Sequence, residues 1–190
     1  MDFLFHGRDK PDADPLLERF TEAHWSFMDG YADRLLVRGP TLSADGEVHT
    51  GSLHIVSLSS TAETDTFAYQ EPYYRAGCYA EIVIRRWHDQ LGRPIRDFRT
   101  LGREGDEPLF LLLGHAVPGA RPPEPSRELA PTDRDRLAAY GWTQTLDGAQ
   151  WTGFAAVMPA SSLDVINVLL AHAPLTASAE IHRWCVGGRR

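Results

Sequence analysis

The sequence predicts an α+β fold made of two β-α-β-β-α-β units whose sheets pack against each other within one chain. An internal repeat relates the two halves of the chain, and each half combines short apolar strands with helix-like segments. The predicted strands also carry apolar residues on the face that their own helices do not cover. A second sheet would cover that face, which would otherwise be an exposed apolar patch.

The repeat is visible when the chain is compared with itself at an offset of 102 residues. Residues 33–60 and 135–162 then share 11 identities in 28 aligned positions, where average residue usage gives about 2 by chance. Turn residues recur in the same order, so that Asp45-Gly46 is followed 102 residues later by Asp147-Gly148. This pattern predicts a tandem duplication.

The first unit begins with a short apolar strand and an amphipathic helix. We expect the strand over residues 3–6 and the helix over residues 15–28. Asp14 as N-cap, with a proline at the next position, is typical of a helix start, and Gly30 is typical of a left-handed helix stop. The apolar positions recur at helical spacing, and His24 lies among them.

The rest of the first unit reads as a hairpin, a second helix and a last strand. Two strands are expected over residues 35–42 and 53–58, joined by the turn Asp45-Gly46. A capping-box pattern that begins at Ser60 precedes the second helix, and residues 79–87 form the fourth strand. This order is the ferredoxin-like motif, in which the helices lie on one face of the sheet.

The second unit is expected to keep its strands but to lose most of its first helix. Five prolines in residues 115–131 cannot continue a helix, which is therefore shortened to roughly residues 132–139. The second helix of this unit is expected over residues 163–171. The expected divisions of the chain are the first unit, a polar connector and a degenerate second unit, over residues 1–87, 88–107 and 108–190.

Composition excludes several classes of function. The 19 Lys and Arg residues against 26 Asp and Glu give a net charge of −7, which disfavours nucleic-acid binding. The longest purely apolar runs, such as residues 109–113, are far shorter than the ~20 residues of a membrane span, so we expect a cytoplasmic protein. Two cysteines without C-x-x-C spacing and eight dispersed histidines predict no disulfide scaffold and no metal site. Phosphate-cradling glycine motifs are absent, and we expect no cofactor.

Short motifs follow one another along the first unit. They are Gly7-Arg8-Asp9-Lys10-Pro11, Ala23-His24, Asp33-Arg34-Leu35, Gly39-Pro40, Gly51-Ser52-Leu53, Pro72-Tyr73, Ala76-Gly77 and Ile84-Arg85-Arg86-Trp87. In this order they resemble the YCII-related family over nearly all of residues 1–87, whereas the second unit is similar only through the repeat. The resemblance implies a dimeric α/β barrel and kinship with muconolactone isomerase-type enzymes. Because both units lie in one chain here, we expect an intrachain barrel that needs no second copy.

The resemblance also implies a His–Asp active site, which falls on His24 and Asp33. A carboxylate beside an inward-facing imidazole orients the ring and raises its basicity, as acid–base catalysis requires. From helical spacing alone, a structural core histidine is the better interpretation of His24, and Asp33 could be a turn or cap residue; the resemblance reverses this preference.

Four further residues are candidates for substrate binding. Asp9 lies in a Gly-x-Asp-x-Pro pattern of the family, although a turn-stabilising aspartate fits this position equally well. Ser52 and His54 alternate with Leu53 and therefore share one face of their strand. His6 lies at the end of the first strand. We expect these side chains to line a pocket between the two sheets.

Two classes of function follow from these residues. The first is a cofactor-independent isomerase, dehydratase or lyase, in which His24 transfers a proton on a small carbonyl- or lactone-containing metabolite. The second is a non-catalytic ligand-binding or regulatory barrel, in which His24 only hydrogen-bonds the ligand. An orienting carboxylate favours the enzyme, because a binding histidine does not need one. A third class is a cofactorless monooxygenase or a haem-binding barrel, because related barrel families include both. A colourless purified protein would exclude haem.

Overall fold

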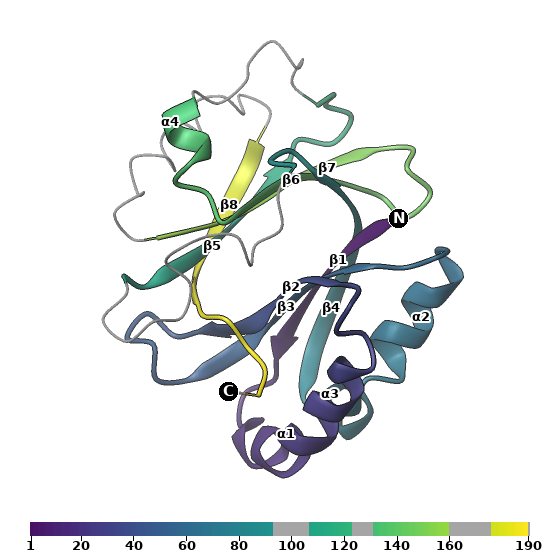
Figure 1. Ribbon diagram of the computed structural model, residues 1–190, viewed down its shortest axis with the longest axis vertical. Helices are drawn as coiled ribbons and strands as arrows, with labels where there is room; N and C mark the ends of the chain where they lie inside the picture. The colour runs from purple at the N-terminus through teal and green to yellow at the C-terminus, as the bar shows by residue number, and fades with distance from the viewer. Residues whose placement is uncertain (93–106, 123–130, 160–175, 190) are drawn as a thin grey trace.

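The computed structural model describes residues 1–92, 107–122, 131–159 and 176–189, and within these ranges it contains eight strands and four helices (Figure 1). The strands are β1 (Asp2–Asp9), β2 (Leu35–Leu42), β3 (His49–Ser57), β4 (Tyr79–Asp89), β5 (Leu109–Ala116), β6 (Ala139–Gln144), β7 (Trp151–Pro159) and β8 (Thr176–Trp184). The helices are α1 (Asp14–Asp29), α2 (Ala62–Tyr69), α3 (Pro72–Ala76) and α4 (Pro131–Arg134).

All eight strands form one antiparallel sheet that closes on itself as a barrel, in the order β1-β3-β2-β8-β5-β7-β6-β4. Within this order the first four strands are neighbours as β4-β1-β3-β2, and the last four as β8-β5-β7-β6. The two groups meet at two short seams, where β2 pairs with β8 through two residue pairs and β4 pairs with β6 through four. The predicted α+β fold with a large antiparallel sheet is confirmed.

The two faces of strands β1 to β4 have different neighbours. Phe3 and Phe5 of β1 pack with Met28 of α1 and Phe67 of α2, so this face lies under the helices (Figure 1). Leu4, on the opposite face, packs in the barrel interior with residues of β3, β5 and β7. Because successive side chains of a strand point to opposite faces, residues 3 and 5 face the helices while residues 4, 6 and 8 face the interior.

The helix α1 differs from its prediction at both ends. Ala13 rather than Asp14 is the N-cap residue, and Asp14 lies in the first turn, where its negative charge is favourable. Gly30 has a φ of −62°, because the chain continues into a further right-handed turn instead of stopping in the left-handed region. The short helix α3 was not predicted.

The second half agrees only in part with its prediction. The shortened helix expected over residues 132–139 is α4, which ends at Arg134, and Ala139 already begins β6. The helix expected over residues 163–171 lies outside the described residues. The expected connector falls between the end of β4 at Asp89 and the start of β5 at Leu109, and residues 93–106 within it are also outside the described part.

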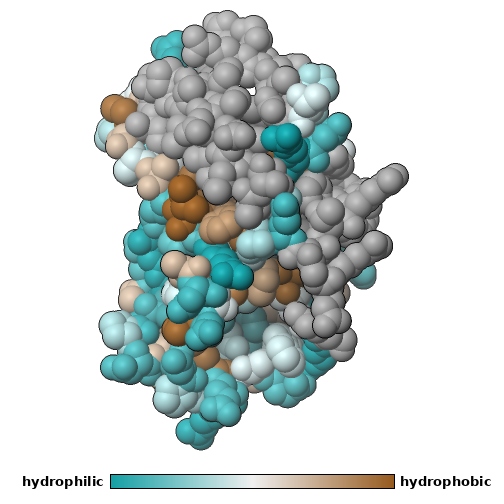
Figure 2. All heavy atoms as spheres, turned by 90° about the vertical axis from the view of Figure 1, so that its left-hand side faces the viewer, coloured by the Kyte–Doolittle hydropathy of each residue, from teal (hydrophilic) through white to brown (hydrophobic). Residues whose placement is uncertain are grey.

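Figure 2 shows one face of the molecule, on which hydrophilic residues predominate among the coloured atoms and hydrophobic residues are scattered between them. Exposed large hydrophobic side chains of the described residues are Met1, Val48, Tyr69, Tyr74, Val117, Ile181 and Val186. Across the described ranges, the protein has no helix of the length and apolar character that crossing a membrane requires.

Candidate functional site

A cavity of about 300 Å³ lies between helix α1, the outer face of β2 and β3, and the C-terminal segment that follows β8. The side chains of interest in its lining are His24, Arg38, His49, Ser52, His54 and Tyr73. The amphipathic pattern of α1 turns His24 toward the sheet, and the alternation of β3 turns Ser52 and His54 toward the helix. The cavity therefore brings together polar side chains from four elements, α1, β2, β3 and α3.

The imidazole of His24 lines this cavity and belongs to a buried histidine–carboxylate pair. Nδ1 of His24 lies 2.6 Å from Oε1 of Glu71, and both side chains are almost fully buried. Glu71 is the N-cap residue of α3, and its two oxygens accept hydrogen bonds from the backbone N–H groups of Tyr73 (2.9 Å) and Tyr74 (2.8 Å). Because this carboxylate acts as an acceptor throughout, Nδ1 of His24 is the donor, and it is Nε2 that carries the lone pair whenever the ring is neutral.

The ring of His24 is also held on its face. The ring of Tyr73 stacks on it with the centroids 4.2 Å apart and the planes 8° from parallel. The Tyr73 hydroxyl lies 3.1 Å from Oγ1 of Thr21, and burial raises the pKa of this phenol. Stacking and the Glu71 hydrogen bond together fix the plane and the rotation of the imidazole. Nε2 makes no hydrogen bond within the described residues.

Two side chains of β3 in the cavity, Ser52 and His54, are uncharged. The ring of His54 lies 5.7 Å from that of His24, and burial, followed by the charge of His24, lowers the pKa of His54 well below its ordinary value. Oγ of Ser52 accepts a hydrogen bond from the Tyr79 hydroxyl at 3.2 Å, and burial raises the pKa of Tyr79 well above its ordinary value. These groups therefore remain uncharged near neutral pH and can offer hydrogen bonds to a ligand without adding charge.

A second histidine–carboxylate pair lies beside the cavity. Nδ1 of His49, which lines the cavity, is 2.6 Å from Oδ2 of Asp9, and the Asp9 side chain is almost fully buried. The other carboxylate oxygen of Asp9, Oδ1, is buried without a hydrogen-bond partner in the described part of the chain. Burial and then the charge of Asp9 raise the pKa of the nearby Cys78 thiol to about 11, so this thiol is not a nucleophile at neutral pH.

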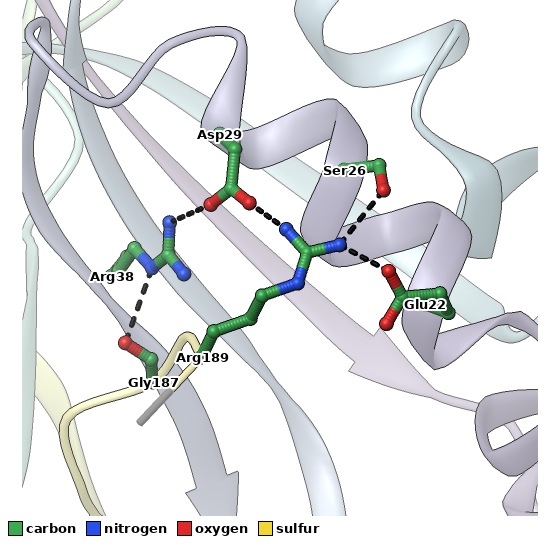
Figure 3. Close-up of polar contacts among 6 residues, drawn as sticks. All are labelled: Glu22, Ser26, Asp29, Arg38, Gly187 and Arg189. Carbon is green, nitrogen blue, oxygen red and sulfur yellow. Dashed lines mark hydrogen bonds and ion pairs between the residues drawn. The ribbon is translucent and has the colours of Figure 1, made fainter.

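The C-terminal segment closes one side of the cavity through arginine contacts (Figure 3). Nε of Arg38 donates to the carbonyl oxygen of Gly187 at 3.1 Å, and its Nη1 donates to Asp29 at 3.3 Å. Arg189 contacts Asp29, Glu22 and Ser26 on the exposed side of α1. Val186, Gly187 and Gly188 line the cavity as a result.

The predicted pairing of His24 with Asp33 is wrong. Asp33 is exposed in the turn after α1, and the carboxylate that contacts His24 belongs to Glu71. Nine helical residues would already place Asp33 about 14 Å along the axis from His24. Glu71 was missed because glutamate is not a preferred N-cap residue, although the proline that follows it is typical of a first helical position.

The predicted pocket between the sheets is also corrected. Ser52 and His54 face the helices and line the cavity beside His24, whereas Leu53 faces the barrel interior. His6 is the exception, because it lies on the interior face of β1 and lines a different cavity. Asp9 reaches the site through His49, a residue that the sequence had not indicated. Among the described residues there is no cluster of three or more side chains that could hold a metal ion.

Comparisons with known proteins give a family for the first half of the chain. Residues 1–88 match the model of the YCII-related domain, as the motifs of the first half predicted. No curated protein matches the chain.

Solved structures resemble the chain at low identity. A 5-chloro-2-hydroxyhydroquinone dehydrochlorinase from Burkholderia phenoliruptrix AC1100 is 29% identical, with a TM-score of 0.44, over 46% of this chain and 94% of that one. An anthrone oxidase-like protein is 10% identical, with a TM-score of 0.56, over 100% of this chain and 92% of that one. A chlorite dismutase variant from Candidatus Nitrospira defluvii is 9% identical, with a TM-score of 0.52, over 96% and 90%. The last two show that the fold of the whole chain is a known one.

Proposed function

We propose that the YCII-related domain of residues 1–88 is a cofactor-independent acid–base catalyst, with His24 as the catalytic group and Glu71 as its positioning residue. The single observation that supports this most strongly is the buried His24–Glu71 hydrogen bond of 2.6 Å on the wall of a cavity. A histidine that only binds a ligand does not need a carboxylate behind it, whereas a proton-transferring histidine gains from one.

The proposed step is removal of a proton from a carbon next to a carbonyl group. Nε2 of His24 takes the proton, the C–H electron pair moves into an enolate, and the Glu71 carboxylate stabilises the imidazolium that forms. The imidazolium then returns the proton to a different carbon, which is an isomerisation. Alternatively, the enolate expels a leaving group from the neighbouring carbon, which is an elimination, and the imidazolium supplies a proton to that group.

The proposed substrate is a small carbonyl- or lactone-containing metabolite. A cavity of about 300 Å³ is at the small end of ligand sites, so the substrate must be compact. His54 and Ser52 provide uncharged hydrogen-bonding groups opposite His24. Arg38 lines the same cavity and supplies a positive charge that favours an enolate oxygen or a substrate carboxylate.

Proton removal can be tested before the complete reaction is known. The full chain is incubated in D₂O with a panel of small oxo acids, enol lactones and hydroxylated quinones, and exchange at the carbon next to the carbonyl is followed by NMR. For the compounds that exchange, His24→Ala should slow the exchange by about 10²-fold or more. Glu71→Gln should slow it less, because the imidazole remains but its orientation and the stabilisation of its cation are weakened.

Asp33→Asn is the matched control, because Asp33 is a nearby exposed carboxylate that does not contact His24. Its exchange rate should equal that of the unchanged protein. Panel compounds that shift the His24 NMR signals without any exchange would contradict the catalytic proposal and favour a ligand-binding barrel.

We also infer that the two halves of the barrel arose from one duplicated unit, so that a single chain completes the barrel. Corresponding hydrogen bonds at the 102-residue offset support this. Thr50 donates to Thr41 at 3.1 Å, and the corresponding Thr152 donates to Thr143 at 2.9 Å. Light scattering of the purified chain should then give the mass of one chain.

A further inference from the structure

The barrel interior is apolar over most of its length but polar at one end. Leu4, Leu53 and Leu111 belong to the apolar core between the strands of the two halves. Farther along β1, on the same interior face, lie His6 and Arg8. Here a cavity of about 240 Å³ opens between strands of both halves, and it shares no lining residue with the cavity beside His24.

One carboxylate in this polar end is already saturated. Glu180 of β8 accepts hydrogen bonds from Nη2 of Arg8 (2.6 Å), Nε2 of His115 (2.6 Å) and Nε2 of His182 (3.2 Å). Burial alone would raise the pKa of Glu180, but the hydrogen bonds from His115 and Arg8 lower it to about 2. Glu180 therefore stays anionic and has little capacity to bind a further cation.

A buried histidine of the same cavity lacks hydrogen-bond partners. His6 is 2% exposed, lines the cavity and makes no hydrogen bond within the described residues, although its ring lies 5.3 Å from that of His182. Burial, followed by the charge of His182, lowers the pKa of His6 to about 4, so the ring is neutral and offers one donor and one acceptor. Burying an imidazole without hydrogen-bond partners costs free energy, unless water or a ligand forms hydrogen bonds with its nitrogens.

The positive charge of the cavity is also incompletely neutralised. Arg85 of β4 donates to the backbone oxygen of Ile84 and makes no ion pair among the described residues. Nε of Arg8 is buried without a hydrogen bond, 3.8 Å from the exposed carboxylate of Glu81. Apolar side chains, among them Val83 and Leu113, complete the wall.

We propose that this interior cavity is a second ligand site, which binds a small organic carboxylate with a compact apolar body. The carboxylate pairs with the Arg85 guanidinium, His6 supplies a hydrogen bond deeper in the cavity, and the apolar body contacts Val83 and Leu113. Anion binding at a guanidinium is strong because the hydrogen bonds are charge-assisted. The site is separate from the proposed catalytic cavity and does not depend on its activity.

Benzoate is a suitable probe, because it combines a carboxylate with a compact apolar ring, and benzamide is its neutral counterpart. The full chain is titrated with each compound by calorimetry and by NMR of the imidazole protons. We expect saturable benzoate binding that shifts the His6 signals, and binding of benzamide weaker by about tenfold or more. Arg85→Met and, separately, His6→Leu should each weaken benzoate binding by about tenfold or more.

His24→Ala is the matched control, because it changes only the other cavity, and it should leave the benzoate affinity unchanged. Circular dichroism and the NMR spectrum of each variant establish that it is folded. Loss of benzoate binding in His24→Ala with retention in Arg85→Met would assign the ligand to the other cavity and overturn the proposal. No saturable shift of the His6 signals at about 10 mM benzoate would overturn it as well.

Discussion

Acidification between pH 8 and pH 5 should destabilise the protein through His6. The pKa of this buried ring is about 4 in the folded protein, against 6.5 for a histidine in the unfolded chain. Between these two values the unfolded chain binds more protons than the folded one, so the free energy of unfolding falls as the pH falls. The stability that neutral His6 provides is complete above pH 6.5 and is lost progressively toward pH 4.

The size of the effect follows from the same two values. A difference of about 2.5 pKa units corresponds to roughly 3 kcal/mol when both states are fully protonated. At pH 5 the unfolded chain is almost fully protonated at this position and the folded protein is not, so His6 accounts for a loss of about 2 kcal/mol. The pKa of Glu180 is lowered to about 2, so the contribution of Glu180 to stability is lost only below about pH 4.5. The effects of His6 and Glu180 on stability therefore fall in different pH ranges.

The assay compares urea unfolding of the unchanged protein and of His6→Leu at pH 8 and at pH 5. The quantity of interest is the change in the free energy of unfolding between the two pH values, which should be smaller by about 2 kcal/mol in His6→Leu. Other buried groups, such as His54, contribute to both proteins and cancel. His88→Leu removes an exposed imidazole and serves as the control, with a pH dependence like that of the unchanged protein.

Equal losses of stability between pH 8 and pH 5 in the unchanged protein and in His6→Leu would refute this reasoning. Such a result would mean that the ring is protonated in the folded barrel, or that water reaches it freely. A shift of the His6 NMR signals with a midpoint near pH 6.5 would lead to the same conclusion.

Two further predictions concern the backbone and the C-terminal segment. Gly153→Ala should lower the free energy of unfolding by about 2 kcal/mol or more, because φ of Gly153 is +134° and a Cβ would collide with the carbonyl oxygen of Gly114. Gly30→Ala is the control and should change the free energy of unfolding by about 1 kcal/mol or less. Equal urea midpoints for the two variants would contradict this prediction. Arg189→Ala should increase hydrogen exchange at the Gly187 amide, which donates to the Arg38 carbonyl oxygen. The free energy of unfolding should change by less than about 1 kcal/mol, because the contacts that Arg189 loses are exposed. Unchanged exchange would mean that Arg189 does not hold the C-terminal segment in place.

The local elements of the first half were predictable because their signals are local. The strand expected over residues 35–42 is β2 with the same bounds, and the helix expected over residues 15–28 is α1 with one more residue at each end. Proline and glycine mark the turns, and apolar residues recur at the helical or strand period in between. The five-residue helix α3 escaped because it is too short to show a period.

The candidate site was predictable only as far as single elements allow. The helical stripe of α1 indicated that His24 faces inward, and strand alternation indicated that Ser52 and His54 share a face. Which carboxylate meets the imidazole was decided by tertiary packing, because Glu71 is 47 residues from His24 in the chain and reaches it only through the position of α3.

The sequence by itself thus determined the helices and strands of the first half, the match of that half to the YCII-related domain and the side chains that belong together on one face. Alternation states that residues 52 and 54 lie on the same face of β3, but it does not state whether that face meets the helices or the barrel interior. Only closure of the eight strands decided this, since it placed Leu53 and His6 inside the barrel and left His54 under α1. The physical reason is that periodicity depends on neighbouring residues, whereas the choice of face and of ion-pair partner depends on contacts between distant segments.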